Sequence, residues 1–208
     1  MSKVVQTYCS FFKTLSPDVW QCLERYAALL SEWNEKINLV SRKETNLFEN
    51  HILPILPLAE DTEAHAYFDN LKSVLDVGTG GGIPGIPLAI LFPKVSFTLL
   101  DSIRKKTVAV ADMVEKLALS NVQVACERLE NLSERYDACI GRGVTAFDHF
   151  IVATAKHLKP RGSVFYWSGG DVEDLVPASL RYRTRVTDLE VFFHGRYAVT
   201  KKLLWYRK

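Results

Sequence analysis

The sequence predicts an α/β protein in which a parallel sheet carries helices on both faces, with a helical extension before it and an antiparallel hairpin after it. Three observations lead to this class. The first 70 residues show helical periodicity, short β-branched runs alternate with helical segments from Ser73 onward, and two β-rich runs close the chain. We therefore expect a helical extension over residues 1–70, packed on a core domain over residues 71–208.

Two helices are expected in the extension. Ser16-Pro17-Asp18 has the pattern of an N-cap followed by proline at the first helical position. A second helix is expected over Glu44–Leu53, limited by Pro54 and Pro57, and the acidic stretch 60–63 is expected to be a loop. The first helix is indicated by large side chains at three- and four-residue steps, namely Trp20, Leu23, Tyr26, Ala27, Leu30 and Trp33.

Five short apolar runs predict the parallel strands, each separated from the next by a helix or a turn. They are residues 74–77, 95–100, 122–125, 138–140 and 163–167. Two further β-rich runs, Val186–Phe193 and Tyr197–Tyr206, flank His194-Gly195-Arg196 and predict the closing hairpin.

The first predicted strand runs into the glycine-rich turn Gly78–Gly82, and a helix is expected to begin near Pro84. Glycine lets the backbone turn sharply and lets a ligand approach without a Cβ in the way. The N-terminus of the following helix offers free amides and the positive end of its dipole to an anionic group. The turn therefore predicts a site for a nucleotide-like cofactor.

Two cofactors fit this turn. Residues 80–85 satisfy G-x-G-x-x-G, the dinucleotide pattern, whereas Asp76, Gly78, Gly80 and Gly82 satisfy the acidic-x-Gly-x-Gly-x-Gly pattern of methyltransferases. S-adenosylmethionine carries an ammonium and a sulfonium group, so Asp76 would suit its methionine end, directly or through water. A nicotinamide dehydrogenase needs a second nucleotide-binding half, for which little chain is left. S-adenosylmethionine is favoured, and the nicotinamide cofactor is the alternative.

Asp101 ends the second predicted strand, 21 residues beyond Gly80, where a carboxylate accepts both ribose hydroxyls of a bound nucleoside. NAD has the same ribose, so Asp101 does not separate the two cofactors. The same carboxylate would also cap the helix expected near Ile103, and the two roles are compatible.

Four separate segments between Trp33 and Trp167 carry a resemblance to a known family. They are Asn34-Glu-Lys-Ile-Asn38-Leu-Val-Ser, His51-Ile-Leu, the glycine loop 75–88 with its paired prolines Pro84 and Pro87, and Leu100-Asp-Ser-Ile-Arg-Lys-Lys106. They resemble the RsmG (GidB) family of bacterial 16S ribosomal-RNA guanine-N7 methyltransferases. The resemblance implies a Rossmann-like class I methyltransferase sheet, S-adenosyl-L-methionine as the cofactor, and 16S rRNA or the small ribosomal subunit as the partner.

The resemblance also implies a set of site residues. Gly78, Gly80 and Ile83 would line the methionine and ribose, and Asp101 would bind the ribose. Leu129 and Glu130 match the pair that contacts the adenine edge. Arg142, after the fourth predicted strand, would face the methyl donor and the substrate. The alternative for Arg142 is a surface salt bridge, but the carboxyl edge of a parallel sheet is where such folds bind ligands.

The sequence departs from the family in three places. The family's Asp-Ser after His-Ile-Leu is Pro54-Ile55 here, its Ser-Arg-Ala is Gly141-Arg142-Gly143, and its Lys-Gly after the fifth strand is Ser168-Gly169. These changes leave the cofactor site intact and affect RNA recognition. They keep open two alternatives, a small-molecule acceptor and a non-catalytic ribosome-binding relative.

The absence of an acid–base dyad agrees with methylation at guanine N7. This nitrogen presents a lone pair and needs no base, so the enzyme has mainly to align the reacting atoms and exclude water. The sequence also lacks the D/N-P-P-Y/F tetrapeptide of adenine methylation and the Pro-Cys of cytosine-C5 methylation.

Charge and composition indicate which kinds of partner the protein can have. Residues 156–208 hold 11 lysines and arginines against 5 acidic residues, which indicates either a phosphate-bearing partner or a solvated basic hairpin. Cysteine and histidine spacing predicts no metal site, and no signal peptide or membrane span is expected, so we expect a cytoplasmic monomer. Candidate RNA contacts are Arg104, Lys105, Lys106, Lys156, Lys159, Arg161, Arg181, Arg183 and Arg185.

Overall fold

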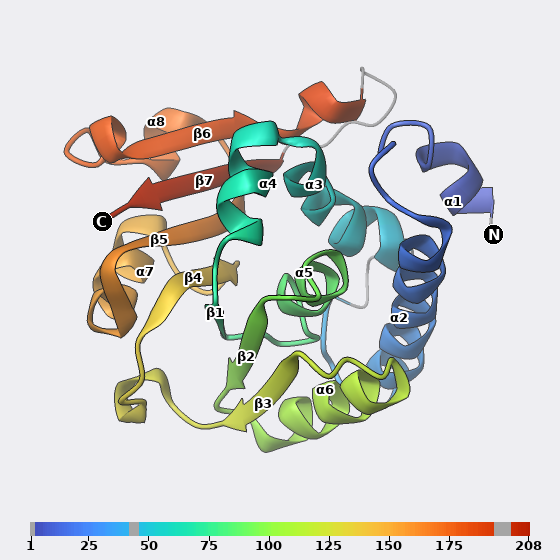
Figure 1. Ribbon diagram of the computed structural model, residues 1–208. Helices are drawn as coiled ribbons and strands as arrows, with labels where there is room; N and C mark the ends of the chain where they lie inside the picture. Colours follow the sequence, from blue (N-terminus) through green and yellow to red (C-terminus); the bar gives the residue numbers. More distant parts are fainter. Residues whose placement is uncertain (1–2, 42–45, 194–200) are drawn as a thin grey trace.

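The computed structural model describes residues 3–41, 46–193 and 201–208. Within these residues, seven strands form one sheet in the order β3-β2-β1-β4-β5-β7-β6, and helices cover both of its faces (Figure 1). Strands β1 to β5 are parallel to one another, whereas β7 runs antiparallel to both β5 and β6. The predicted α/β class is therefore confirmed.

The strands are β1 (Ser73–Val77), β2 (Ser96–Asp101), β3 (Val122–Cys126), β4 (Tyr136–Arg142), β5 (Leu158–Gly169), β6 (Thr184–Asp188) and β7 (Lys201–Arg207). The α-helices are α1 (Lys3–Tyr8), α2 (Pro17–Lys36), α3 (Pro57–Glu60), α4 (Thr62–Asp69), α5 (Gly85–Leu91), α6 (Arg104–Lys116), α7 (Phe147–Thr154) and α8 (Val172–Leu175). A π-helical turn, η1 (Phe48–Ile52), and short 3₁₀ turns complete the described chain: η2 (Leu53–Ile55), η3 (Leu129–Asn131), η4 (Ala155–His157), η5 (Arg181–Arg183) and η6 (Leu189–Phe193).

The five predicted parallel strands are all present, and their register decides where a site can form. Asp76 in β1 lies opposite Leu99 in β2 and Ile140 in β4. The carboxyl ends of β1, β2 and β4 therefore meet at one edge of the sheet. This edge is where parallel α/β sheets bind ligands.

Helix α2 forms as its sequence predicts. Ser16 is the N-cap, and its side chain accepts a hydrogen bond from the Val19 amide at 3.4 Å. The apolar stripe buries Trp20, Leu23 and Tyr26 against the face of the sheet on which α5 and α6 also pack. The extension thus shares a hydrophobic core with the sheet, while its division from the core domain at residue 70 stays a prediction.

The sheet separates two hydrophobic cores. The face that carries Ile140 and Trp167 packs on α2, η1 and α4. The opposite face carries Leu75 and Tyr166 and packs on α7. Because side chains alternate between the faces of a strand, Arg142 projects on the same side as Ile140, which is the side of the N-terminal extension.

The prediction for residues 44–63 was wrong in two respects, and its first two residues lie outside the described chain. Pro54 and Pro57 do not limit the helical stretch, because each occupies a first-turn position of η2 or α3, where the missing amide is not needed. The acidic stretch is not a loop. Glu60 ends α3, and Asp61 is the N-cap of α4, accepting a hydrogen bond from the Ala64 amide at 3.1 Å.

The closing hairpin pairs antiparallel as predicted, but its first strand is shorter. β6 ends at Asp188, and the expected continuation to Phe193 is the 3₁₀ turn η6. Burial explains this turn, because Leu189 and Phe193 enter the core and Phe193 meets the Phe12 ring at 5.7 Å. The predicted turn at residues 194–196 and the first residues of the second run lie outside the described chain.

Candidate active site

The glycine turn takes the backbone through conformations that other residues rarely adopt. Gly78, Gly80 and Gly82 have φ angles of +68°, +58° and +90°. In this left-handed region a Cβ crowds the backbone, so glycine is strongly favoured at these three positions. The turn places its backbone at the surface of two adjoining pockets.

Asp76 braces this turn from beneath. It is fully buried, and its Oδ2 accepts hydrogen bonds from Thr79 Oγ1 at 2.6 Å and from the Gly85 amide at 3.0 Å. Its Oδ1 has no hydrogen-bond partner among the described residues, and burial raises the pKa of the carboxyl group to about 7. Asp76 lines neither pocket, so its contact with the methionine end of a cofactor stays a prediction.

Asp101 links the glycine turn to the second strand. Its Oδ2 accepts a hydrogen bond from the Gly80 amide at 3.1 Å, and its Oδ1 accepts one from the Ile103 amide at 2.9 Å. The second bond satisfies a free amide at the start of α6, so the expected contact with the helix start exists. The same carboxylate borders a pocket, which leaves the ribose role open as predicted.

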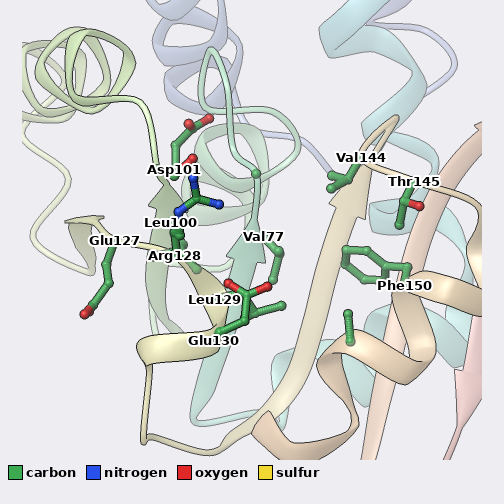
Figure 2. Close-up of a pocket in the computed structure, with 13 residues that line it drawn as sticks. Val77, Leu100, Asp101, Glu127, Arg128, Leu129, Glu130, Val144, Thr145 and Phe150 are labelled. Carbon is green, nitrogen blue, oxygen red and sulfur yellow. The ribbon is translucent and has the colours of Figure 1, made fainter.

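One pocket, here called the acidic pocket, lies between the ends of β1, β2 and β4 and has a volume of about 260 Å³ (Figure 2). Leu129 and Glu130, the predicted adenine contacts, line it from the turn η3. Its lining includes the carboxylates of Asp101, Glu127 and Glu130 against the single cation of Arg128. The acidic pocket therefore presents carboxylate acceptors to the hydroxyl and amino groups of a ligand.

A second pocket of about 260 Å³, here called the basic pocket, lies on the other side of the glycine turn and shares Gly78 with the first. Its cations are Lys106, from the first turn of α6, and Arg142, from the end of β4. Among the described residues that line it, none is a carboxylate: Leu39, Val40, His51, Gly78, Thr79, Gly80, Gly81, Ile83, Lys106, Arg142 and Gly143. The two pockets thus differ in the sign of their charge.

Arg142 is held rigidly in the basic pocket. Its Nη1 donates to the His51 carbonyl at 3.0 Å, and its Nη2 donates to the Asn50 carbonyl at 2.9 Å. Nη2 also lies 2.9 Å from His51 Nδ1. Because a guanidinium can only donate, Nδ1 is the acceptor, which assigns the ring proton of a neutral His51 to Nε2. The segment 50–51 thereby fixes the direction of the guanidinium.

His51 is neutral in this arrangement. Burial lowers its pKa first, and the positive charges of Arg142 and Lys201 lower it further, to about 4. An imidazole with this pKa acts near neutral pH as a hydrogen-bonding support for Arg142. It is not charged and does not repel the guanidinium.

The N-terminal extension builds one wall of the basic pocket. Tyr26 Oη donates to the Gly81 carbonyl at 2.8 Å in a buried position. Asn34 Oδ1 accepts hydrogen bonds from the amides of Leu39 and Val40 at 2.9 and 3.0 Å, which fixes the segment that lines the pocket. A Cβ at Gly81 would lie 2.8 Å from Leu30 Cδ1, so α2 packs directly on the glycine turn.

Comparison with known proteins identifies the family. The rRNA small subunit methyltransferase G (GidB) family matches residues 20–185. The chain belongs to this family. Ribosomal RNA small subunit methyltransferase G of Cytophaga hutchinsonii is 36% identical over 201 residues, which cover 93% of this chain and 95% of that protein. The relative of the same name from Christiangramia forsetii is 35% identical, over 94% of this chain and 93% of its own.

Solved structures agree on the fold, which is the Rossmann-like class I methyltransferase fold. An S-adenosylmethionine-dependent O-methyltransferase of Thermotoga maritima superposes with a TM-score of 0.53 at 16% identity, covering 72% of this chain and 64% of that one. A mutant of MtNAS in complex with S-adenosylmethionine superposes with a TM-score of 0.56 at 12% identity, covering 87% and 72%.

The residues that the structure adds to the set named from sequence include four in the basic pocket. His51, Leu39 and Val40 line the basic pocket, and Lys106, which had been named as an RNA contact, lines it as well. The first three lie in segments that carry the family resemblance, so those segments held the available signal. Local sequence does not reveal that they meet Arg142, because the chain returns to it after about 90 residues.

Two departures from the family pattern have a local explanation. A Cβ at Gly141 would lie 2.6 Å from the Phe150 ring, so glycine makes room for an aromatic side chain of α7. Gly143 has a φ of +63°, a conformation that favours glycine. The loop after β4 is therefore built on glycine without displacing Arg142.

Four of the nine candidate RNA contacts fall into two groups. Lys159 pairs with Asp137 at 3.0 Å, and Arg185 pairs with Asp61 at 2.6 Å, so these cations hold the fold together. Arg104 and Lys105 are exposed on the first turn of α6, next to the basic pocket. The second group is placed where an RNA approaching this pocket would meet it.

The described part of the chain contains no helix with the length and apolar character needed to cross a membrane. Among the same residues, no group of three or more histidine, cysteine, aspartate or glutamate side chains is arranged to hold a metal ion.

Proposed function

We propose that this protein transfers a methyl group from S-adenosyl-L-methionine to N7 of a guanine in 16S ribosomal RNA. The observation that carries the proposal is the junction at Gly78 of two pockets with opposite charge. The acidic pocket offers carboxylates to the hydroxyl and amino groups of an adenosine, and the basic pocket offers hydrogen-bond donors to a guanine and its phosphates. Membership of the rRNA small subunit methyltransferase G family supports ribosomal RNA as the acceptor.

The residues present fit the cofactor. Asp101 borders the acidic pocket with a carboxylate that would accept the ribose hydroxyls, and Leu129 with Glu130 would contact the adenine edge. The methionine end would then pass Gly78, Gly80, Ile83 and Arg142 into the basic pocket. The unpaired buried Oδ1 of Asp76 agrees with a cationic group nearby, because an unsatisfied carboxylate oxygen is costly to bury. The combined volume is in the range of roughly 300–1,000 Å³ typical of small-molecule sites.

The reaction requires positioning more than acid–base chemistry. When bound, S-adenosylmethionine supplies an electrophilic methyl group, and guanine N7 already holds a lone pair. Arginine and lysine donate well to the O6 and N7 edge of guanine. A donor directed at O6 leaves N7 open, and we assign this role to Arg142, which Asn50 and His51 hold in place. This scheme requires no proton transfer by neutral His51.

The partner and location follow from the same proposal. The substrate is 16S rRNA, naked or in the small ribosomal subunit, and the enzyme works in the cytoplasm as a monomer. Lys106 in the basic pocket, with Arg104 and Lys105 beside it, would meet the phosphates.

The test is methylation of small ribosomal subunits by the purified protein, read by mass spectrometry of the nucleosides. We expect N7-methylguanosine to appear in 16S rRNA, and Arg142→Ala to lower kcat/KM about 100-fold, the scale of a misplaced reactant. Arg25→Ala, an exposed arginine on α2, is the matched control. Absence of N7-methylguanosine refutes the acceptor, and failure to bind S-adenosylmethionine in calorimetry refutes the cofactor. Binding of NADH would instead support the nicotinamide alternative.

A further inference from the structure

The carboxyl edge of the sheet carries a third cation outside the basic pocket. Strand β7 begins with Lys201 and Lys202, and its antiparallel pairing brings this beginning to the edge where β5 ends. Lys201 lies opposite Gly169, and Lys202 lies opposite Ser168. Two consecutive lysines therefore lie beside the position at which the sequence departs from the family's Lys-Gly.

The two lysines face opposite sides of the sheet, because neighbouring side chains of a strand alternate. Lys201 shares a face with Leu203, which pairs with Trp167, and Trp167 pairs with Arg142 in β4. Lys202 points to the other face, where its Nζ lies 3.0 Å from Asp188 Oδ2. Lys201 is thus the lysine on the side of the candidate active site.

The charge of Lys201 reaches the active site. Together with burial and Arg142 it lowers the pKa of His51, the residue whose Nδ1 accepts from the Arg142 guanidinium. Its cross-strand neighbour is Gly169. The charge of Lys201 therefore adds to that of Arg142 at His51.

The strand order gives the spacing of the cations. Neighbouring strands are about 4.8 Å apart, and Lys201 lies two residues beyond Leu203, the residue of β7 in register with Arg142, so the two Cα atoms are roughly 12 Å apart. Lys106 follows β2, which lies two steps from β4 on the other side. In the order of the strands, Arg142 therefore lies between the two lysines. Cations placed on both sides of Arg142 suit a nucleic-acid strand that passes over it, because such a strand carries a phosphate at every nucleotide.

We propose that Lys201 is a substrate-positioning residue that binds a backbone phosphate of the RNA beside the target guanine. The proposal rests on the proposed function, because Arg142 marks where that guanine lies. Lys201 supplies this contact from β7, in a chain that has Ser168 in place of the family's lysine on β5. The phosphate contact sets the position of the RNA strand, and the methyl transfer itself takes place at Arg142.

The test compares Lys201→Ala with Lys94→Ala, which removes the same charge from an exposed position before β2, at the opposite end of the sheet. Binding of a fluorescent 16S rRNA fragment is titrated over a range of salt concentrations. We expect Lys201→Ala to bind about tenfold more weakly and to lower the slope of log K against log salt by about one. Lys94→Ala should match the wild type, and Lys201→Arg should restore binding.

Calorimetry with S-adenosylmethionine reports whether the variants are folded, and its Kd should be unchanged by Lys201→Ala. If the alanine variant does not fold, Lys201→Gln takes its place. An unchanged RNA affinity and salt slope overturn the role of Lys201, whatever the activity. If the wild type binds RNA without methylating it while Lys201→Ala binds weakly, the proposed function falls and the phosphate contact stands. A wild type that does not bind the RNA refutes both.

Discussion

Asn34 offers a direct measure of how the N-terminal extension supports the active site. Its side chain is 8% exposed, and Oδ1 accepts hydrogen bonds from the amides of Leu39 and Val40 at 2.9 and 3.0 Å. Asn34→Ala removes both bonds and leaves two amides without this acceptor. Leu39 is itself buried, so water does not replace the lost partner easily. The substitution therefore tests a wall of the basic pocket without touching the cations in it.

The expected loss can be worked out from these contacts. Each buried donor left unsatisfied costs roughly 1–3 kcal/mol. Asn34 lies in the last turn of α2, where the higher helix propensity of alanine offsets about 0.6 kcal/mol of this loss. For two amides, the free energy of unfolding should therefore fall by about 1–5 kcal/mol. Binding of S-adenosylmethionine should also weaken, because Leu39 and Val40 lose their fixed position in the pocket wall.

Urea unfolding followed by circular dichroism measures the first effect, and calorimetry measures the second. Asn38→Ala is the matched control, because Asn38 is exposed in the same segment. Its free energy of unfolding should change by less than about 0.5 kcal/mol. An Asn34→Ala protein as stable as this control would refute the assignment of the two hydrogen bonds as a support of the pocket.

Three further predictions concern the glycine turn and its neighbours. In Gly85→Ala the new Cβ would lie 2.2 Å from Leu99 Cδ2 and 2.6 Å from Asp76 Oδ2. Thermal unfolding should therefore show that the free energy of unfolding falls by about 1–3 kcal/mol. An unchanged Tm would contradict this close packing. The pKa of His51 is about 4, against its usual 6.5. The contribution of His51 to the stability of the folded protein is therefore complete above pH 6.5 and is lost as the pH falls through 4. Denaturant titrations across that range should show the free energy of unfolding fall by roughly 3 kcal/mol. In His51→Asn this pH dependence should be absent. The pKa of Asp76 is instead raised to about 7. The contribution of Asp76 to the stability of the folded protein is therefore complete below pH 3.8 and is lost as the pH rises through 7. The stability of the wild type relative to Asp76→Asn should therefore fall by about 4 kcal/mol between pH 4 and 8, and a constant difference would count against a buried carboxyl group.

Local pattern predicted much of the fold. The five parallel strands follow from branched apolar runs, and α2 follows from its N-cap and three- and four-residue periodicity, because these features act within one element. The errors arose where tertiary burial overrides local pattern. Leu189 and Phe193 look like strand residues but enter the core from a 3₁₀ turn. Asp61 looks like part of an acidic loop but caps α4 and pairs with Arg185.

The sequence by itself determined the glycine turn and the class of cofactor that suits it. Positive φ angles at Gly78, Gly80 and Gly82 can be anticipated from residue type, since a Cβ is excluded there. The tertiary structure alone decided what surrounds Arg142. The extension brings His51 to its guanidinium, α6 brings Lys106, and β7 brings Lys201 to the same edge. Each of these contacts joins residues distant in sequence, so it depends on sheet order and register, which local residue preferences do not encode.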